Sequence, residues 1–278
     1  MAFGLIIIGD EILSGKRVDQ HFPKVLEILS SRGLSLSWAE YVGDDPARIT
    51  ATLKRTLSSD DIVFCTGGIG ATPDDHTRQC AAAALGVPLL LHPQAREKIG
   101  ERITDTAREK GEVPDFESAV NLHRLKMGEF PQGAEIIPNS YNKIPGFSVV
   151  NPGTQSPQKA AQTAHAGMHH FAPGFPVMAW PMFEWVLDTY HAALFHQNPQ
   201  LEQSVLVFGA MESALTPLME AIEAEFPLVK VFSLPHVGNA QMRNHIDLGV
   251  KGEPIQSAAA FVKLLAGLDQ LHAEYKPA

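Results

Sequence analysis

Residues 66–75 combine the residue types that bind phosphate groups. Three glycines leave the backbone free to turn sharply, so that successive N–H groups can converge on one anion. A helix predicted to follow this stretch would add the positive end of its dipole. The two aspartates that end the stretch would repel a phosphate unless a divalent cation such as Mg²⁺ lay between them. These residues therefore indicate a site for a phosphorylated small molecule.

In this loop we expect ligand contacts from the glycine backbone and from two threonine hydroxyls. The expected ligand-binding residues are Thr66, Gly67, Gly68, Gly70 and Thr72. Asp74 and Asp75 are the expected catalytic and metal-binding residues, although one of them would also suit the N-cap of the following helix. The loop lacks the Gly-Lys-Ser/Thr ending of a Walker A motif, and it is not a Rossmann fingerprint.

A second polar loop, residues 9–19, follows the first apolar run of the chain. Its three carboxylates, hydroxyl and two bases suit a ligand site, but they would also suit a well-capped connection between a strand and a helix. The ligand-binding residues expected here are Gly9, Asp10, Glu11, Ser14 and Gly15.

The elements around these loops predict an α/β fold with a mostly parallel sheet. Residues 3–8 and 61–65 are short apolar runs, typical of strands that are buried on both faces. Apolar residues recur at helical spacing over 22–29 and 49–57, and residues 34–38 alternate as a further strand. Ligands bind beyond the carboxyl ends of parallel strands, so the two polar loops should lie on one edge of the sheet.

The remaining sequence predicts a less regular region and then a small C-terminal α+β unit. Residues 151–170 are rich in Gln, Ala, Ser and His and indicate a flexible excursion, with His169 and His170 as a solvated pair. From residue 204 onward the pattern predicts three strands and two helices.

Composition excludes several classes of function. The formal net charge is −9 and no basic run stands out, so the chain is unsuited to bind nucleic acid through its phosphates. No stretch approaches the roughly 20 apolar residues that span a bilayer. Cys65 and Cys80 are the two cysteines, and both fit small core positions in a reducing compartment. We therefore expect a cytoplasmic protein without a membrane or nucleic-acid partner.

The two loops together resemble those of the molybdopterin-binding fold shared by MoaB, MogA, MoeA, gephyrin and CinA. The resemblance is strongest to the N-terminal part of CinA and to the related domain of eukaryotic FAD synthase. Further stretches agree in the same order, namely residues 41–45, 130–139, 143–147 and 172–176. Residues 212–215 and 231–235 resemble parts of the small KH-like α+β domain of CinA.

This resemblance implies a three-layer α/β domain over residues 1–172 and a KH-like domain over residues 173–278, in a protein that forms homo-oligomers. The implied ligand is either molybdopterin or a dinucleotide pyrophosphate such as ADP-ribose or FAD, which the CinA branch hydrolyses with a divalent metal. The family's acidic residue after the glycine-rich loop falls on Asp74 or Asp75, and its first-loop glutamate falls on Glu11, a further expected metal ligand.

The sequence departs from the family pattern at several places. Residues 141–146 replace a Gly-Thr-Ala-Pro-Gly element, and Lys143, Pro145 and Gly146 of this stretch are expected to contribute to the ligand pocket. Relatives carry a glutamate shortly after the Pro-Gly-x-Pro segment, where this chain has Met178 and its neighbours. The resemblance does not extend to the amidase domain of CinA, so deamidation of nicotinamide mononucleotide is not expected.

Three functions remain open on the sequence. The first is a metal-dependent pyrophosphatase that acts on ADP-ribose or FAD. The alternative is a protein of molybdenum cofactor biosynthesis that binds molybdopterin without turnover. The third is an interaction module that has lost its ligand, and the retained glycines and carboxylates argue against it.

Overall fold

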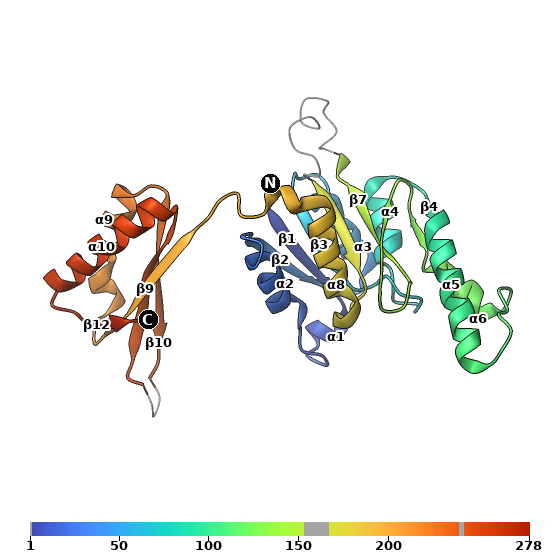
Figure 1. The fold of residues 1–278 in the computed structure, drawn as a ribbon, viewed down its shortest axis with the longest axis horizontal. Coiled ribbons are helices and arrows are strands. Elements are labelled where there is room, and N and C mark those ends of the chain that lie inside the picture. The colour runs from blue at the N-terminus through green and yellow to red at the C-terminus, as the bar shows by residue number, and fades with distance from the viewer. Residues whose placement is uncertain (1, 153–166, 239–241) are drawn as a thin grey trace. The chain divides into compact units, whose positions relative to one another are not determined.

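The computed structural model describes residues 2–152, 167–238 and 242–278, and the chain divides into two compact units. The units are Met1–Phe195 and His196–Ala278 (Figure 1). This boundary lies later in the chain than the expected one between residues 172 and 173. The reason is helix α8 (Pro176–Val186), which buries its apolar face in the core of the first unit.

A six-stranded sheet in the order β2-β1-β3-β8-β7-β6 forms the centre of the first unit. Its parallel part comprises β1 (Phe3–Ile8), β2 (Leu36–Val42), β3 (Ile62–Thr66) and β8 (Met168–Ala172). β7 (Gly146–Val150) is antiparallel to β8 and to the edge strand β6 (Glu135–Ile137). The mostly parallel sheet is therefore confirmed.

Helices cover both faces of this sheet and create two separate apolar cores (Figure 1). On one face lie α2 (His21–Ser30) and α8, and on the other lie α3 (Pro46–Thr56) and α4 (Thr77–Leu85). Alternate residues of β1 enter the two cores, which explains why the whole strand is buried. The three-layer α/β architecture is confirmed.

Smaller elements complete the first unit. The short helix α1 (Asp10–Leu13) follows β1, and after α8 the chain continues through a π-helix (Leu187–His191) and a 3-10 turn (Ala192–Leu194). The long α5 (Pro93–Lys110) and α6 (Ala119–Lys126) lie beside the two-stranded sheet of β4 (Leu89–Leu91) and β5 (Glu129–Pro131), at one end of the unit in Figure 1.

The expectation that His169 and His170 form a solvated loop pair is wrong. Both lie in β8 with no exposed surface, in the middle of the main sheet. Residues 153–166 of the expected flexible excursion lie outside the described part of the chain, and the segment that follows is a core strand.

Hydrogen bonds on both ring nitrogens compensate the burial of these imidazoles. His169 contacts the Asn151 amide oxygen through Nδ1 and the Thr56 hydroxyl through Nε2, each at 2.8 Å. His170 contacts the Ser148 hydroxyl at 2.8 Å, and its Nε2 lies 2.9 Å from Nε2 of the π-helix residue His191. The histidines therefore connect the sheet to helices on both of its faces.

The C-terminal unit is a four-stranded antiparallel sheet with two helices packed on one face. Along the chain it comprises β9 (Leu201–Phe208), α9 (Glu212–Glu225), β10 (Val229–His236), β11 (His245–Gly252), α10 (Pro254–Gln270) and β12 (Glu274–Pro277). This β-α-β-β-α-β order with the sheet order β10-β11-β9-β12 is the ferredoxin-like arrangement. A small α+β unit is confirmed, while a KH-like domain is not, and the short polar β12 was missed by the sequence pattern.

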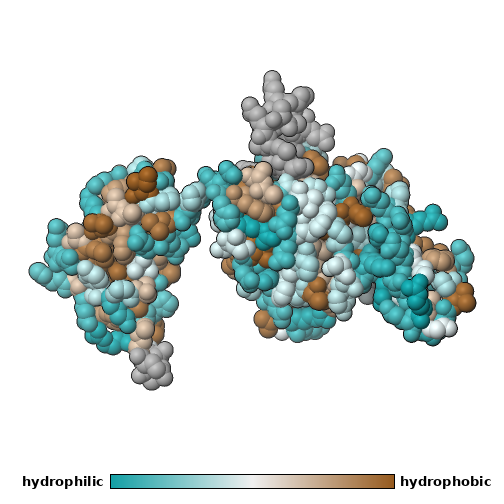
Figure 2. All heavy atoms as spheres, in the orientation of Figure 1, coloured by the Kyte–Doolittle hydropathy of each residue, from teal (hydrophilic) through white to brown (hydrophobic). Residues whose placement is uncertain are grey.

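Hydrophilic residues cover most of the surface in Figure 2, and hydrophobic residues appear there as separate small patches. Within the described residues, no helix combines the length and apolar character that a membrane crossing needs.

The burial of His169 predicts a defined acid sensitivity. Burial lowers the pKa of His169 from 6.5 to about 3, so between these values the unfolded chain binds a proton that the folded chain excludes. The free energy of unfolding should therefore fall as pH falls through 6.5, by about 2 kcal/mol between pH 7 and pH 5. Urea denaturation should show a smaller loss in His169→Gln than in the wild type, and the difference is the contribution of His169, since His21, whose pKa burial also lowers, remains in both proteins.

A matched control is His123→Gln, which removes an exposed histidine from α6. It should keep the pH dependence of the wild type. If the free energy of unfolding depended on pH in the same way for the wild type and for His169→Gln, His169 would not be a neutral, buried side chain.

Candidate functional site

The two predicted loops meet where the winding of the sheet reverses. Helix α2 follows β1 on one face, whereas α4 follows the adjacent strand β3 on the opposite face. In open α/β sheets this reversal leaves a crevice beyond the carboxyl ends of the two strands, and ligands bind there. Residues 9–19 and 67–76 form the two sides of this edge, as the sequence predicts.

The glycine-rich loop lies too close to β1 for a side chain. At Gly67, where φ is 97°, an added Cβ would lie 2.0 Å from the Ile8 carbonyl oxygen. At Gly68, where φ is 65°, it would lie 2.2 Å from the Thr77 hydroxyl. Thr77 in turn donates its hydroxyl to the Gly67 carbonyl at 3.0 Å and its N–H to the Gly68 carbonyl at 2.9 Å. Both glycines are therefore required by close packing, and α4 holds the loop from the other side.

The second half of the loop is closed by Asp75. One of its carboxylate oxygens accepts both the backbone N–H of Thr72 at 2.8 Å and the Thr72 hydroxyl at 2.6 Å. An added Cβ at Gly70 would lie 2.6 Å from this oxygen. The expected N-cap role of an aspartate is not confirmed, because α4 begins at Thr77. Asp75 therefore stabilises the loop, and Asp74 is left exposed.

Arg78 of α4, a residue that the sequence did not single out, binds the backbone of the glycine-rich loop. Its side chain is buried and donates from Nη2 to the Gly70 carbonyl at 2.6 Å and from Nη1 to the Lys126 carbonyl. Burial lowers the pKa of Arg78, while the carboxylates of Asp75 and Glu129 act in the opposite direction. The guanidinium therefore places a largely desolvated positive charge behind the glycine-rich loop.

The first loop is joined to the loop after β2 by a reciprocal pair of hydrogen bonds. The Asp10 N–H donates to the Asp44 carboxylate at 2.8 Å, and the Asp44 N–H donates to the Asp10 carboxylate at 3.2 Å. Burial raises the pKa of Asp44, and the negative charges of Asp10, Glu11 and Asp74 raise it further, against the bond from the Asp10 amide. Asp44 is thus a member of the acidic edge that the sequence did not identify.

Asp19 and His21 fix the end of the first loop. Asp19 accepts the N–H groups of His21 at 2.8 Å and Phe22 at 3.1 Å, and also the Tyr41 hydroxyl at 2.8 Å. Burial and this carboxylate raise the pKa of Tyr41 to about 12. Burial lowers the pKa of His21, and its Nε2 lies 3.1 Å from the Gly174 carbonyl oxygen. The loop after β8 is therefore held in place by α2.

Several predicted ligand-binding residues have structural roles. Thr66 is buried at the end of β3, and Gly146 starts β7 where an added Cβ would lie 2.2 Å from the Phe171 carbonyl oxygen. Pro145 is buried beside Gly146. The Ser14 hydroxyl lies 3.5 Å from the carbonyl oxygen of Glu11 in its own loop.

The two glycines of the first loop differ in their surroundings, since Gly15 is exposed and Gly9 is half-buried. Gly15 has a φ of 72°, and an added Cβ there would meet nothing within 4 Å. The left-handed backbone conformation, and not close packing, therefore favours glycine at this position. Gly9, with φ of 152°, donates its N–H to the Val42 carbonyl at 3.0 Å and so aligns the first loop with β2.

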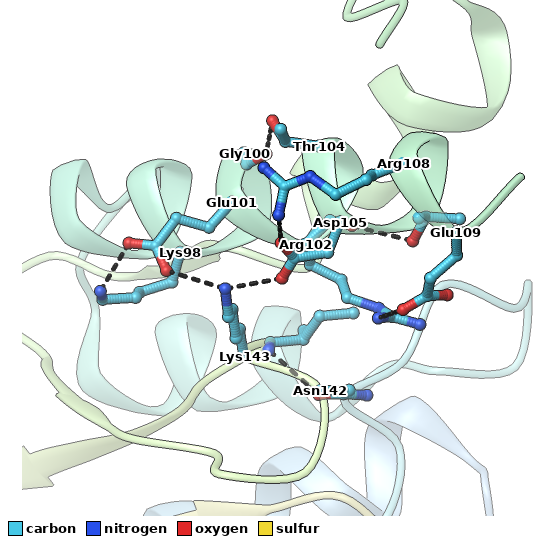
Figure 3. Close-up of polar contacts among 12 residues, drawn as sticks. Lys98, Gly100, Glu101, Arg102, Thr104, Asp105, Arg108, Glu109, Asn142 and Lys143 are labelled. Carbon is cyan, nitrogen blue, oxygen red and sulfur yellow. Dashed lines mark hydrogen bonds and ion pairs between the residues drawn. The ribbon is translucent and has the colours of Figure 1, made fainter. Parts of the chain in front are cut away.

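The structure pairs the ammonium of Lys143 with α5 (Figure 3). Its Nζ lies 2.6 Å from the Asp105 carboxylate and 3.4 Å from that of Glu101. The neighbouring Asn142 accepts the N–H of Ile144 at 3.0 Å. The printed contacts of Lys143 and Asn142 are thus made within the chain, to α5 and to the loop backbone.

No three or more His, Cys, Asp or Glu side chains among the described residues are grouped so that they could hold a metal ion. Glu11, Asp74 and Asp75 therefore do not form a three-ligand site, although Asp10, Asp44 and Asp74 add negative charge to the same edge.

The sheet order and the glycine-rich loop at its reversal point define an open α/β domain with two polar loops at the carboxyl edge of its sheet. The chain belongs to the family described as "probable molybdopterin binding domain", whose profile matches residues 4–193. The matched residues fall within the first structural unit.

Within this family, the chain is similar to CinA-like proteins. One from Anaeromyxobacter sp. (strain K) is 36% identical over 149 residues, which are 54% of this chain and 34% of that protein. One from Desulfovibrio desulfuricans is 28% identical over 262 residues, which are 93% of this chain and 54% of that protein. This chain thus spans between about a third and about half of the length of these curated relatives.

Among solved structures, CinA of unknown function from Thermoplasma acidophilum has the same fold. It matches 67% of this chain and 95% of its own length, with a TM-score of 0.52 and 23% identity.

The packing of the glycine-rich loop predicts a large cost for a side chain at Gly67. Gly67→Ala should lower the free energy of unfolding by about 3 kcal/mol or more, because the methyl group would overlap the Ile8 carbonyl. Gly133→Ala is the matched control, since its φ of 87° is similar but its Cβ would meet nothing within 4 Å. It should cost only the 1–2 kcal/mol or so of the left-handed conformation. If denaturant titrations showed the same loss in the free energy of unfolding for both variants, Gly67 would not lie as close to the Ile8 carbonyl as the structure has it.

Proposed function

We propose that the first unit binds a phosphorylated nucleotide or pterin in the crevice between the loops after β1 and β3, and cleaves the pyrophosphate of ADP-ribose or FAD with a divalent metal. The observation that carries the proposal is the fixed loop at Gly67–Gly70, which the packing of Thr77 and the hydrogen bond from Arg78 hold at the start of α4. Backbone N–H groups and a helix N-terminus are a common phosphate site.

The carboxylates of Asp10, Glu11, Asp44 and Asp74, which influence one another at this edge of the sheet, have the oxygen ligands that Mg²⁺ prefers. Asp74 is exposed, and its charge adds to those of Asp10 and Glu11 in raising the pKa of Asp44. A cation would relieve this repulsion, and Mg²⁺ typically takes one or two carboxylates together with phosphate oxygens and water. When bound, such an ion would polarise the phosphorus and activate a water molecule. The Gly67 N–H already donates to the Ala172 carbonyl at 3.1 Å, so the amides of residues 68–70 would be the ones to stabilise the negative charge that develops on the phosphate.

Binding of molybdopterin without hydrolysis is the second candidate, and Met178 favours it. By the family resemblance, Met178 stands where a glutamate is expected, and its sulfur accepts the Asn142 side-chain amide at 3.3 Å. An acidic group is therefore replaced by an uncharged one that is already in contact with the loop before β7. We also propose, on the family resemblance, that the protein forms homo-oligomers with either function.

Substitution of Asp74 should lower catalysis, whereas substitution of Asp75 should lower the stability of the loop. Purified protein incubated with ADP-ribose, FAD or NAD and with Mg²⁺, Mn²⁺ or Co²⁺ should release mononucleotide products resolved by chromatography. Asp74→Asn should lower kcat/KM by about 100-fold or more, as expected for a lost metal ligand. Asp75→Asn should instead lower the free energy of unfolding by about 1.5 kcal/mol, because it weakens the bonds from Thr72.

Glu109→Gln is a matched control, since this α5 carboxylate pairs with Arg102 away from the crevice. It should leave cleavage unchanged. Absence of metal-dependent cleavage by the wild type would reject the hydrolase, and recovery of a bound pterin would then support the second candidate.

A further inference from the structure

Phe175 is a large aromatic side chain that the fold leaves exposed to solvent, one residue after Gly174, which lies near the glycine-rich loop. Its side chain is 54% exposed, and it stands directly before α8 in the loop that follows β8. The preceding residue Gly174 approaches the glycine-rich loop so closely that an added Cβ would lie 3.5 Å from Cα of Gly67. The exposed ring is therefore attached next to the proposed phosphate loop.

The backbone at Phe175 is held in place from three sides. His21 holds the Gly174 carbonyl at 3.1 Å, and the Phe175 carbonyl accepts the N–H groups of Met178 at 3.0 Å and Ala179 at 2.9 Å. Pro176 restricts the residue before it to extended backbone, as observed at φ −94° and ψ 119°. An aromatic ring on such a fixed backbone loses little conformational entropy when it binds a ligand.

Arg17 from the first loop completes this feature. Its guanidinium lies 5.9 Å from the centre of the Phe175 ring, and its backbone N–H donates to the Glu11 carbonyl at 3.0 Å. Among the described residues no carboxylate forms an ion pair with Arg17, although acidic side chains surround the loop. The planar cation and the ring thus come from two different loops, those that follow β1 and β8.

We propose that Phe175 and Arg17 determine the specificity for a planar heteroaromatic ring, which stacks on them while its phosphate binds the loop at Gly67. This inference rests on the proposed function and names the part of the ligand that the phosphate loop does not recognise. Aromatic rings and guanidinium planes stack on any heterocycle, so an adenine and a pterin would both fit. The exposed position of Phe175 follows, because a ring needs one free face to stack.

The test compares ligands with and without a ring. Titration calorimetry would measure the Kd of ADP-ribose, of neopterin phosphate and of inorganic pyrophosphate for the wild type and for Phe175→Leu, Phe175→Tyr and Arg17→Lys. Phe175→Leu should weaken the ring-bearing ligand about tenfold, since one stacking contact is lost. Arg17→Lys keeps the positive charge but loses the planar guanidinium, and it should also weaken binding of the ring-bearing ligand. Pyrophosphate binding should change less than twofold.

Two variants keep the comparison interpretable. Phe175→Tyr retains the aromatic face and should bind like the wild type. Phe116→Leu removes another exposed phenylalanine, 43% exposed and packed beside Gly100 of α5, and should also change nothing. The ring-bearing ligand that the wild type binds more tightly identifies the ring as adenine or pterin.

The outcomes separate the two proposals. If the wild type binds the ring-bearing ligands but Phe175→Leu binds them equally well, or loses pyrophosphate to the same extent, the stacking inference is overturned and the proposed function stands. If the wild type binds none of the three phosphates, the proposed function fails and the inference fails with it.

Discussion

The close approach of the glycine-rich loop to β1 is the constraint on which the site depends. With the Ile8 carbonyl oxygen 2.0 Å from where a Cβ would stand at Gly67, the loop has one position relative to the sheet. Thr77 then fixes the loop to α4, and Arg78 fixes its far end to the last turn of α6. The geometry of the loop backbone is therefore set by packing against β1 and α4.

The electrostatics of the edge follow from this arrangement. Parallel strands bring the loops after β1, β2 and β3 together, and each contributes aspartate or glutamate. Asp10 and Asp44 bind each other's amides, which holds two like charges side by side and contributes to the raised pKa of Asp44. One buried cation, Arg78, lies behind the loop. In the proposed function, the anionic ligand would be bound here together with a cation, because the chain has a net charge of −9 and its carboxylates gather at this edge.

Local patterns predicted the parts of the fold that depend on local sequence. The apolar run of β1 and the glycine spacing at residues 67–70 identified the sheet and the loop at its edge, because sterics and strand burial act over a few residues. The contacts of His169 join residues far apart in the chain, so its polar type indicated a loop although it lies in a core strand. The pairing of Asp44 with Asp10, and of Lys143 with α5, is non-local for the same reason. Only the resemblance to a family had marked residues 41–45.

Gly174 links α2 to the glycine-rich loop, since His21 holds its carbonyl and an added Cβ on Gly174 would lie 3.5 Å from Cα of Gly67. A displacement of the glycine-rich loop would therefore reach Gly174, the residue that directly precedes Phe175. Recognition of the two ends of a ligand would then be mechanically coupled: tight seating of one end would align the other. Affinities of ligand fragments measured separately would in that case sum to less than the affinity of the intact molecule.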